Sequence, residues 1–146
     1  MIELINKNIA NCNTYINDEI IKIMLENIGS IDPVLRDKTI YMGFYNLFND
    51  KKISIIQKEY ILNYILEHNL LNLKIEKNDD FVFTRSFVSL LLVLIIEDHF
   101  DDAWIDDEIQ NEIIKYVINY FENEKDARGY VKNKGWAMLL LMLLII

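Results

Sequence analysis

The chain has 146 residues, of which 52% are hydrophobic and 26% charged, and its net charge at pH 7 is −8. This acidic balance excludes a protein that needs a basic surface to bind nucleic acid or an anionic membrane. Four glycines, one proline and one cysteine exclude collagen-like, low-complexity and disulfide-rich chains, and they disfavour an all-β fold with many turns.

Apolar residues recur at three- and four-residue spacing through much of the chain, which predicts amphipathic helices. Residues 1–14 are polar and Asn-rich, and we expect them to form an arm or a short frayed helix. The helices that follow are predicted over about 15–28, 33–48, 55–68, 81–97 and 108–124. Residues 125–134 form a charged loop in this prediction, and a last apolar helix follows it.

Three helix starts carry capping signals. Asp32-Pro33 places an N-cap side chain before a proline at the first helical position. The segments 54–57 (SIIQ) and 107–110 (DEIQ) have the form of a capping box. These signals predict helix N-termini at residues 33, 55 and 108.

The segment 81–97 is apolar nearly all round from Phe87, which predicts the most buried helix of the fold. We therefore predict an all-α protein of about six antiparallel helices, with helical hairpins stacked in a solenoid-like array. A closed helical bundle is the alternative. Residues 15–137 are expected to form a single helical domain, followed by an apolar tail at 138–146.

Polar residues gather in four clusters at the boundaries of these helices. The candidate site residues are Asp32, Arg36, Asp37, Arg85, Glu124, Asp126, Arg128 and Trp136. All three arginines of the chain are among them, and Asp32 and Arg36 are spaced to share a helix face. One interpretation is a cleft for a small charged ligand or a metal. The favoured one is a salt-bridge network that locks helix ends together.

Arg85 heads the most buried helix, so its guanidinium must find carboxylates or carbonyls. We expect it to pair with at least one of Asp32, Asp37, Glu124 or Asp126. The acidic run 97–108 lacks the spacing and the glycine of an EF-hand loop and is interpreted as a solvated loop. His68 and His99 have no zinc-like spacing, so no metal and no cofactor are predicted.

The lone Cys12 and an N-terminus unlike a signal peptide predict a cytoplasmic location. Both apolar runs of the chain, 87–96 and 137–146, are about half of what spans a bilayer, so no membrane segment is expected.

The four polar clusters, in three segments, carry a resemblance to a known family. Residues 28–37 (IGSIDPVLRD), 83–87 (FTRSF) and 124–137 (EKDARGYVKNKGWA) resemble a bacterial family catalogued as domain of unknown function 2785. The resemblance runs from about residue 16 to Ala137, and the last motif is the longest and most specific. It implies an all-helical fold and supplies no activity.

The sequence departs from that family after Ala137. There the family has a His-Ala-x-Ala-His-x-Ala-Asp pattern, whereas residues 138–146 here are MLLLMLLII. Codons for Met138, Met142 and Ile145, read one nucleotide earlier, can encode His, His and Asp. We therefore interpret the tail as an out-of-frame translation, expect the chain to be truncated relative to its relatives, and expect self-association through the apolar tail.

The sequence thus predicts an uncharacterised cytoplasmic helical protein that acts as a binding or scaffold module for a protein or a small charged ligand. The alternative is a metal-dependent or acid–base hydrolase in intact relatives, because a His-x-x-x-His pair with a following Asp lies on one helix face. That enzyme would be inactive here, since the segment is missing.

Overall fold

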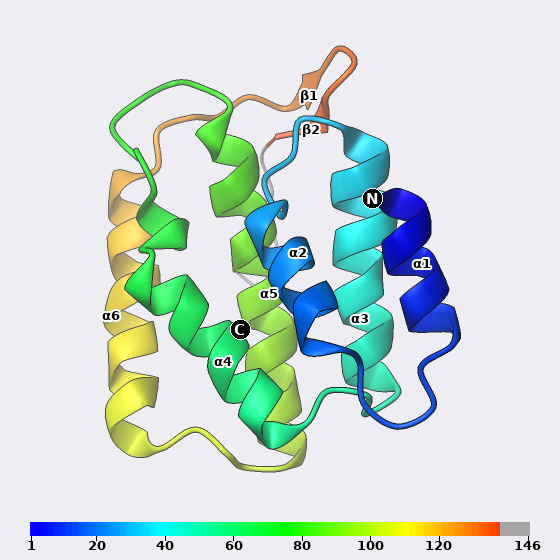
Figure 1. Cartoon of the computed structure of the whole chain (residues 1–146). Coiled ribbons are helices and arrows are strands. Elements are labelled where there is room, and N and C mark those ends of the chain that lie inside the picture. Colours follow the sequence, from blue (N-terminus) through cyan, green and yellow to red (C-terminus); the bar gives the residue numbers. More distant parts are fainter. Residues whose placement is uncertain (138–146) are drawn as a thin grey trace.

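The computed structural model describes residues 1–137. Within them the fold is all-α, as the sequence predicts, apart from one two-stranded hairpin (Figure 1). The elements are α1 (Ile2–Ala10), α2 (Asp18–Glu26), η1 (Val34–Tyr41), α3 (Met42–Asn49), α4 (Ile55–Glu67), η2 (Leu70–Asn72), α5 (Phe81–Asp101), α6 (Asp107–Asn123), β1 (Tyr130–Val131) and β2 (Gly135–Trp136).

The helices form two layers in chain order. Helices α1, α3 and α5 contact one another in that sequence, while α2 contacts α4 and α4 contacts α5. Helices α1 and α6 lie at opposite edges of the molecule in Figure 1. Two such layers are what stacked helical hairpins produce, and the repeat character of the array stays a prediction.

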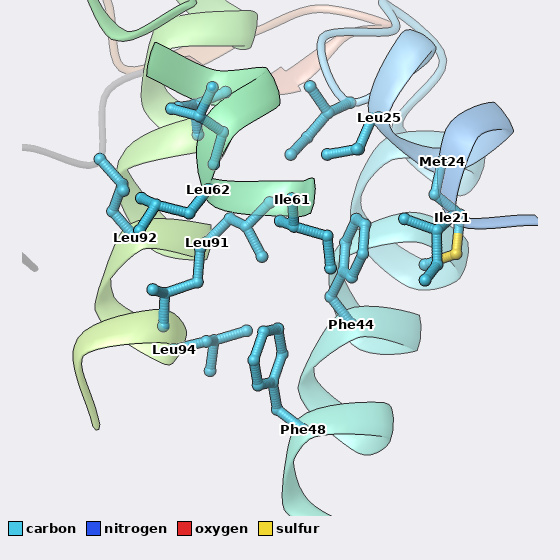
Figure 2. Close-up of a cluster of buried hydrophobic side chains, with 14 of the residues drawn as sticks. Ile21, Met24, Leu25, Phe44, Phe48, Ile61, Leu62, Leu91, Leu92 and Leu94 are labelled. Atoms are coloured by element: carbon cyan, nitrogen blue, oxygen red, sulfur yellow. The ribbon is translucent and has the colours of Figure 1, made fainter. Parts of the chain in front are cut away.

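Helix α5 is the centre of the core, as its apolar run predicts. Leu91 is fully buried and Leu94 nearly so. Figure 2 shows the leucines of α5 facing side chains from α2, α3 and α4. The labelled contributors from those helices are Ile21, Met24, Leu25, Phe44, Phe48, Ile61 and Leu62. Because its neighbours cover α5 on several sides, no residue between 87 and 96 is exposed.

Three predicted helices differ from the structure. Helix α5 continues to Asp101, beyond its predicted end at residue 97, so the start of the acidic run 97–108 is helical and not a loop. The segment 33–48 divides into the π-helix η1 and the α-helix α3. In η1 the Thr39 hydroxyl donates to the carbonyl of Val34, five residues back, at 3.0 Å, which suits the wider π turn. The helix predicted over 15–28 begins at Asp18, because Asn17 caps it by accepting from the amide of Glu19 at 2.8 Å.

The capping signals are confirmed at two of three sites. Asp32 accepts from the amide of Val34 at 2.9 Å. Ser54 and Gln57 form a reciprocal capping box at the start of α4. At α6 the prediction is wrong by one residue, since the cap is Asp106, which accepts from the amide of Ile109 at 2.9 Å. The side chain of Gln110 instead donates to the carbonyl of Ile105.

The two ends of the described chain are both packed. The segment 1–14 contains helix α1, whose Ile5 is fully buried and which contacts η1 and α3. Residues 130–136, expected as a charged loop leading into a helix, form the β1/β2 hairpin. The predicted apolar tail at 138–146 lies outside the described residues. Among helices within residues 1–137, none is long and apolar enough to cross a membrane.

Candidate functional site

The three arginines come to one end of the protein. Arg36 lies on η1, Arg85 on the first turns of α5, and Arg128 in the segment between α6 and β1. In Figure 1 the β1/β2 hairpin lies at this end, beside the start of α5. We call the resulting set of ion pairs the arginine network; its members are Arg36, Asp37, Asp80, Arg85, Glu124, Asp126, Arg128 and Lys134.

Arg85 is fully buried and makes a bidentate pair with Glu124, whose side chain is 1% exposed. Its Nε donates to Glu124 Oε2 at 2.5 Å and its Nη2 to Oε1 at 3.1 Å. Its Nη1 donates to the carbonyl of Leu73 at 2.9 Å. The expected pairing of Arg85 is therefore confirmed, and it ties α5 to the end of α6 and to the loop after η2.

Arg36 is also fully buried, but its partners differ from the expected one. Its guanidinium carbon lies 4.4 Å from the ring centre of Phe83 and 4.7 Å from that of Phe87. Its Nη1 donates to the carbonyl of Ser30 at 2.9 Å and its Nη2 to that of Lys134 at 2.7 Å. Burial lowers the pKa of Arg36, and the neighbouring Asp37 opposes this effect.

The carboxylate beside Arg36 is that of Asp37, not Asp32. Arg36 Nε and Asp37 Oδ1 are 2.7 Å apart, although the N–H is not aligned for a directed hydrogen bond. Burial raises the pKa of Asp37, and Arg36 works against that shift. Asp32 is exposed and its side chain caps η1, so the shared helix face predicted for Asp32 and Arg36 does not produce an ion pair.

Arg128 binds Asp126 through two nitrogens. Its Nε donates to Asp126 Oδ1 at 2.9 Å and its Nη2 to Oδ2 at 2.8 Å. Burial alone would raise the pKa of Asp126, but the bonds from Arg128 outweigh it and lower that pKa. The amide of Asp126 donates to Glu124 Oε1 at 3.0 Å, so the Arg128 pair is joined directly to the Arg85 pair.

Hydrogen bonds and an ion pair hold the hairpin against Arg36 and α5. Lys134 forms an ion pair with Asp80 at 2.8 Å, and the Ser86 hydroxyl donates to the carbonyl of Ala137. Gly135 has φ +83°, and a Cβ there would lie 3.0 Å from Arg36 Nη2. Only glycine combines this backbone conformation with so close an approach to the guanidinium.

The arginine network neutralises its own charge. Arg36, Arg85, Arg128 and Lys134 are each within 4 Å of a carboxylate. These carboxylates are different ones, namely Asp37, Glu124, Asp126 and Asp80. Four cations therefore meet four anions, and the buried donors also reach main-chain carbonyls. Such an arrangement is suited to holding segments together, because no charge is left over for a ligand.

Two aromatic side chains lie at the surface of this site. Trp136 is 58% exposed and Tyr130 is 66% exposed. They are directly opposite one another across the antiparallel β1/β2 pair, edge to face, with ring centres 5.8 Å apart. Trp136 was a sequence candidate, whereas Tyr130 was missed. The only sign of Tyr130 in the sequence is the short segment that separates it from Trp136, which allows the two aromatic side chains to pair across a turn.

A second buried ionic cluster was missed entirely. Asp98 is 4% exposed, although it belongs to the acidic run interpreted as a solvated loop. It pairs with Lys58 Nζ at 2.5 Å and Lys51 Nζ at 3.1 Å, and it accepts from Trp104 Nε1 at 3.0 Å. Burial alone would raise the pKa of Asp98, but the two lysines outweigh it and lower that pKa.

The remaining polar groups do not form a metal centre in residues 1–137, where no group of three or more His, Cys, Asp or Glu side chains could hold an ion. His99 serves the backbone, since its Nδ1 accepts from the amides of Trp104 and Ile105 at 3.0 Å each. The histidine pattern considered for the family concerns residues 138–146, outside the described part of the chain.

Comparison with known proteins finds a family match over part of this site. No curated protein and no solved structure matches the chain. Residues 70–139 match the family model described as Protein of unknown function (DUF2785). This range is narrower than the resemblance seen in the sequence, because the motif at 28–37 precedes it. It includes Arg85, Glu124, Asp126, Arg128 and the hairpin. The resemblance of this segment to the DUF2785 domain, predicted from its motifs, is thus confirmed.

Proposed function

We propose that this chain is a protein-binding module whose contact element is the β1/β2 hairpin. The observation that carries the proposal is the exposed pair Tyr130 and Trp136 on a hairpin fixed by the arginine network. Tyr and Trp are the side chains most enriched at the energetic centres of protein interfaces. In this proposal the network positions the aromatic pair, and the helices serve as its scaffold.

The way in which the hairpin is attached supports this role. Arg36 holds the carbonyl of Lys134, and Asp80 holds its ammonium group. The peptide groups of Gly129 and Ala137 are also joined, by an N–H to O bond of 2.9 Å. A surface that is ordered before binding loses less conformational entropy on association. A fixed aromatic pair is therefore a better anchor than the same residues on a loose loop.

A protein partner is favoured over a small charged ligand. The arginine network leaves no cation or anion without an opposite charge, whereas the aromatic pair presents apolar area with two polar tips. A cytoplasmic location belongs to the same proposal. It is supported by Cys12, a buried free thiol and the sole cysteine of the sequence.

The test compares the partners retained by the full chain with those retained by Trp136→Ala and Tyr130→Ala. Ile56→Ala is the matched control, because Ile56 is 77% exposed and lies on α4. Partners are captured from an extract of the source cells and quantified by mass spectrometry, after circular dichroism shows that each variant is folded. We expect recovery to fall about tenfold or more with each hairpin variant and to be unchanged with the control. An identical partner set for all four proteins would contradict the proposal.

A further inference from the structure

Helix α6 carries a second apolar face, directed away from the core. Ile113 and Tyr120 are buried against the rest of the protein. On the outer side, Ile114 is 56% exposed, Ile118 50% and Phe121 36%. Their spacing of four and three residues places them in one stripe along the helix. We call these three residues the α6 stripe.

Two opposite charges flank the α6 stripe on the same side. Lys115 follows Ile114, and Glu122 follows Phe121, and both side chains are exposed. They are seven residues apart, so they lie almost above one another on the helix. The ion pairs formed within residues 1–137 do not include either of them. Each charge is therefore available to a neighbour that covers the stripe.

We propose that a second copy of this chain covers the α6 stripe, with the two α6 helices antiparallel. A two-fold axis passing between residues 118 and 119 places Lys115 of each copy opposite Glu122 of the other. Both ion pairs then form at once, and the two Ile118 side chains meet at the centre. The stripe has the four-then-three spacing of a short coiled-coil seam, which suits such a helix pair.

The charges select the antiparallel orientation. In a parallel pair, Lys115 and the second copy's Glu122 would be about 10 Å apart along the helix axis, at 1.5 Å per residue. The antiparallel pair instead brings opposite charges to the same height on one flank. The α6 stripe is also distinct from the hairpin and from the tail at 138–146. This proposal therefore stands independently of the proposed function.

The α6 stripe is short, so the dimer is expected to be weak. Helix α6 has 17 residues and is thus about 25 Å long. One such pair of helices buries an area at or below the lower end of standard stable interfaces, which begin at about 1,200 Å². Association should therefore depend strongly on protein concentration.

The experiment measures the monomer–dimer equilibrium of the full chain by sedimentation equilibrium, on variants first shown to be folded by circular dichroism. Lys115→Glu and Glu122→Lys each convert two attractive pairs into two repulsive ones, and each should raise the dissociation constant about tenfold. The double variant exchanges the charges and should return to within about threefold of the original value. Glu112→Lys is the matched control, because residue 112 lies about a third of a turn away from Ile118.

Four results would overturn the proposal. The first is a full chain that stays monomeric at every concentration tested, and the second is a double reversal that fails to restore association. The third is a Glu112→Lys control that weakens association as much as Glu122→Lys does. The fourth is a loss of association on deletion of residues 138–146 while the charge reversals have no effect. The last result would assign self-association to the tail instead of α6.

Discussion

The pair of Arg85 and Glu124 is the part of the arginine network with the largest expected effect on stability. Both side chains are at most 1% exposed, and the guanidinium makes two hydrogen bonds to the carboxylate. Arg85→Ala leaves the Glu124 carboxylate buried with the amide of Asp126 as its remaining donor. Loss of one partner from a buried pair of this kind costs about 3–5 kcal/mol, a large part of the 5–15 kcal/mol that stabilises a typical domain.

Urea unfolding followed by far-ultraviolet circular dichroism measures this cost. Lys134→Ala is the control, because the pair of Lys134 with Asp80 is about a third exposed and should contribute less than about 1 kcal/mol. The double variant Arg85→Met/Glu124→Leu removes both charges and should be more stable than Arg85→Ala. The reasoning is refuted if Arg85→Ala costs no more than Lys134→Ala.

Three further predictions follow from the core and the second ionic cluster. Leu91→Ala should lower the free energy of unfolding by about 2–5 kcal/mol in the same assay, and a loss below about 0.5 kcal/mol would show that α5 is not the centre of the core. The pKa of Asp98 is held below its usual value of 3.8, so its pairing stabilises the fold above that pH. That contribution is lost as the pH falls through the lowered pKa. Asp98→Asn should therefore flatten the dependence of the free energy of unfolding on pH between about 5 and 2. An unchanged slope would contradict this role of Asp98. His99→Asn keeps an acceptor for the amides of Trp104 and Ile105, whereas His99→Leu removes it and should cost about 1–3 kcal/mol more in thermal or urea unfolding. Equal stability of the two His99 variants would count against that role.

The helices could be predicted because the buried face of a helix requires apolar residues at regular spacing in the sequence. The nearly continuous apolar run of α5 and the capping box at Ser54 each indicate a helix by local chemistry alone. The pairing of Arg85 could also be predicted, since a guanidinium on the most buried helix cannot remain unpaired. For the α5 run, the Ser54 cap and Arg85, the residue type alone indicates the environment that the side chain needs.

The parts that sequence reasoning missed depend on distant main-chain groups or on very short elements. The strands of the hairpin have two residues each, too few to show alternation. Arg36 is held by carbonyls of Ser30 and Lys134, and a carbonyl acceptor leaves no mark in the sequence. Asp98 looks like its acidic neighbours, and the fold alone brings Lys58 of α4 to it.

The long chain separations spanned by the arginine network have a kinetic consequence. The bond from Arg36 to Lys134 joins residues 98 positions apart, and the pair of Arg85 with Glu124 spans 39. Closing such loops is slow compared with forming the helices themselves. Because the entropy of closing these loops is lost before the network's own contacts form, we expect the network to form late, after the rate-limiting step of folding. Variants that break it should speed unfolding and leave the refolding rate nearly unchanged in a stopped-flow chevron. On this basis the network sets how long each molecule stays folded.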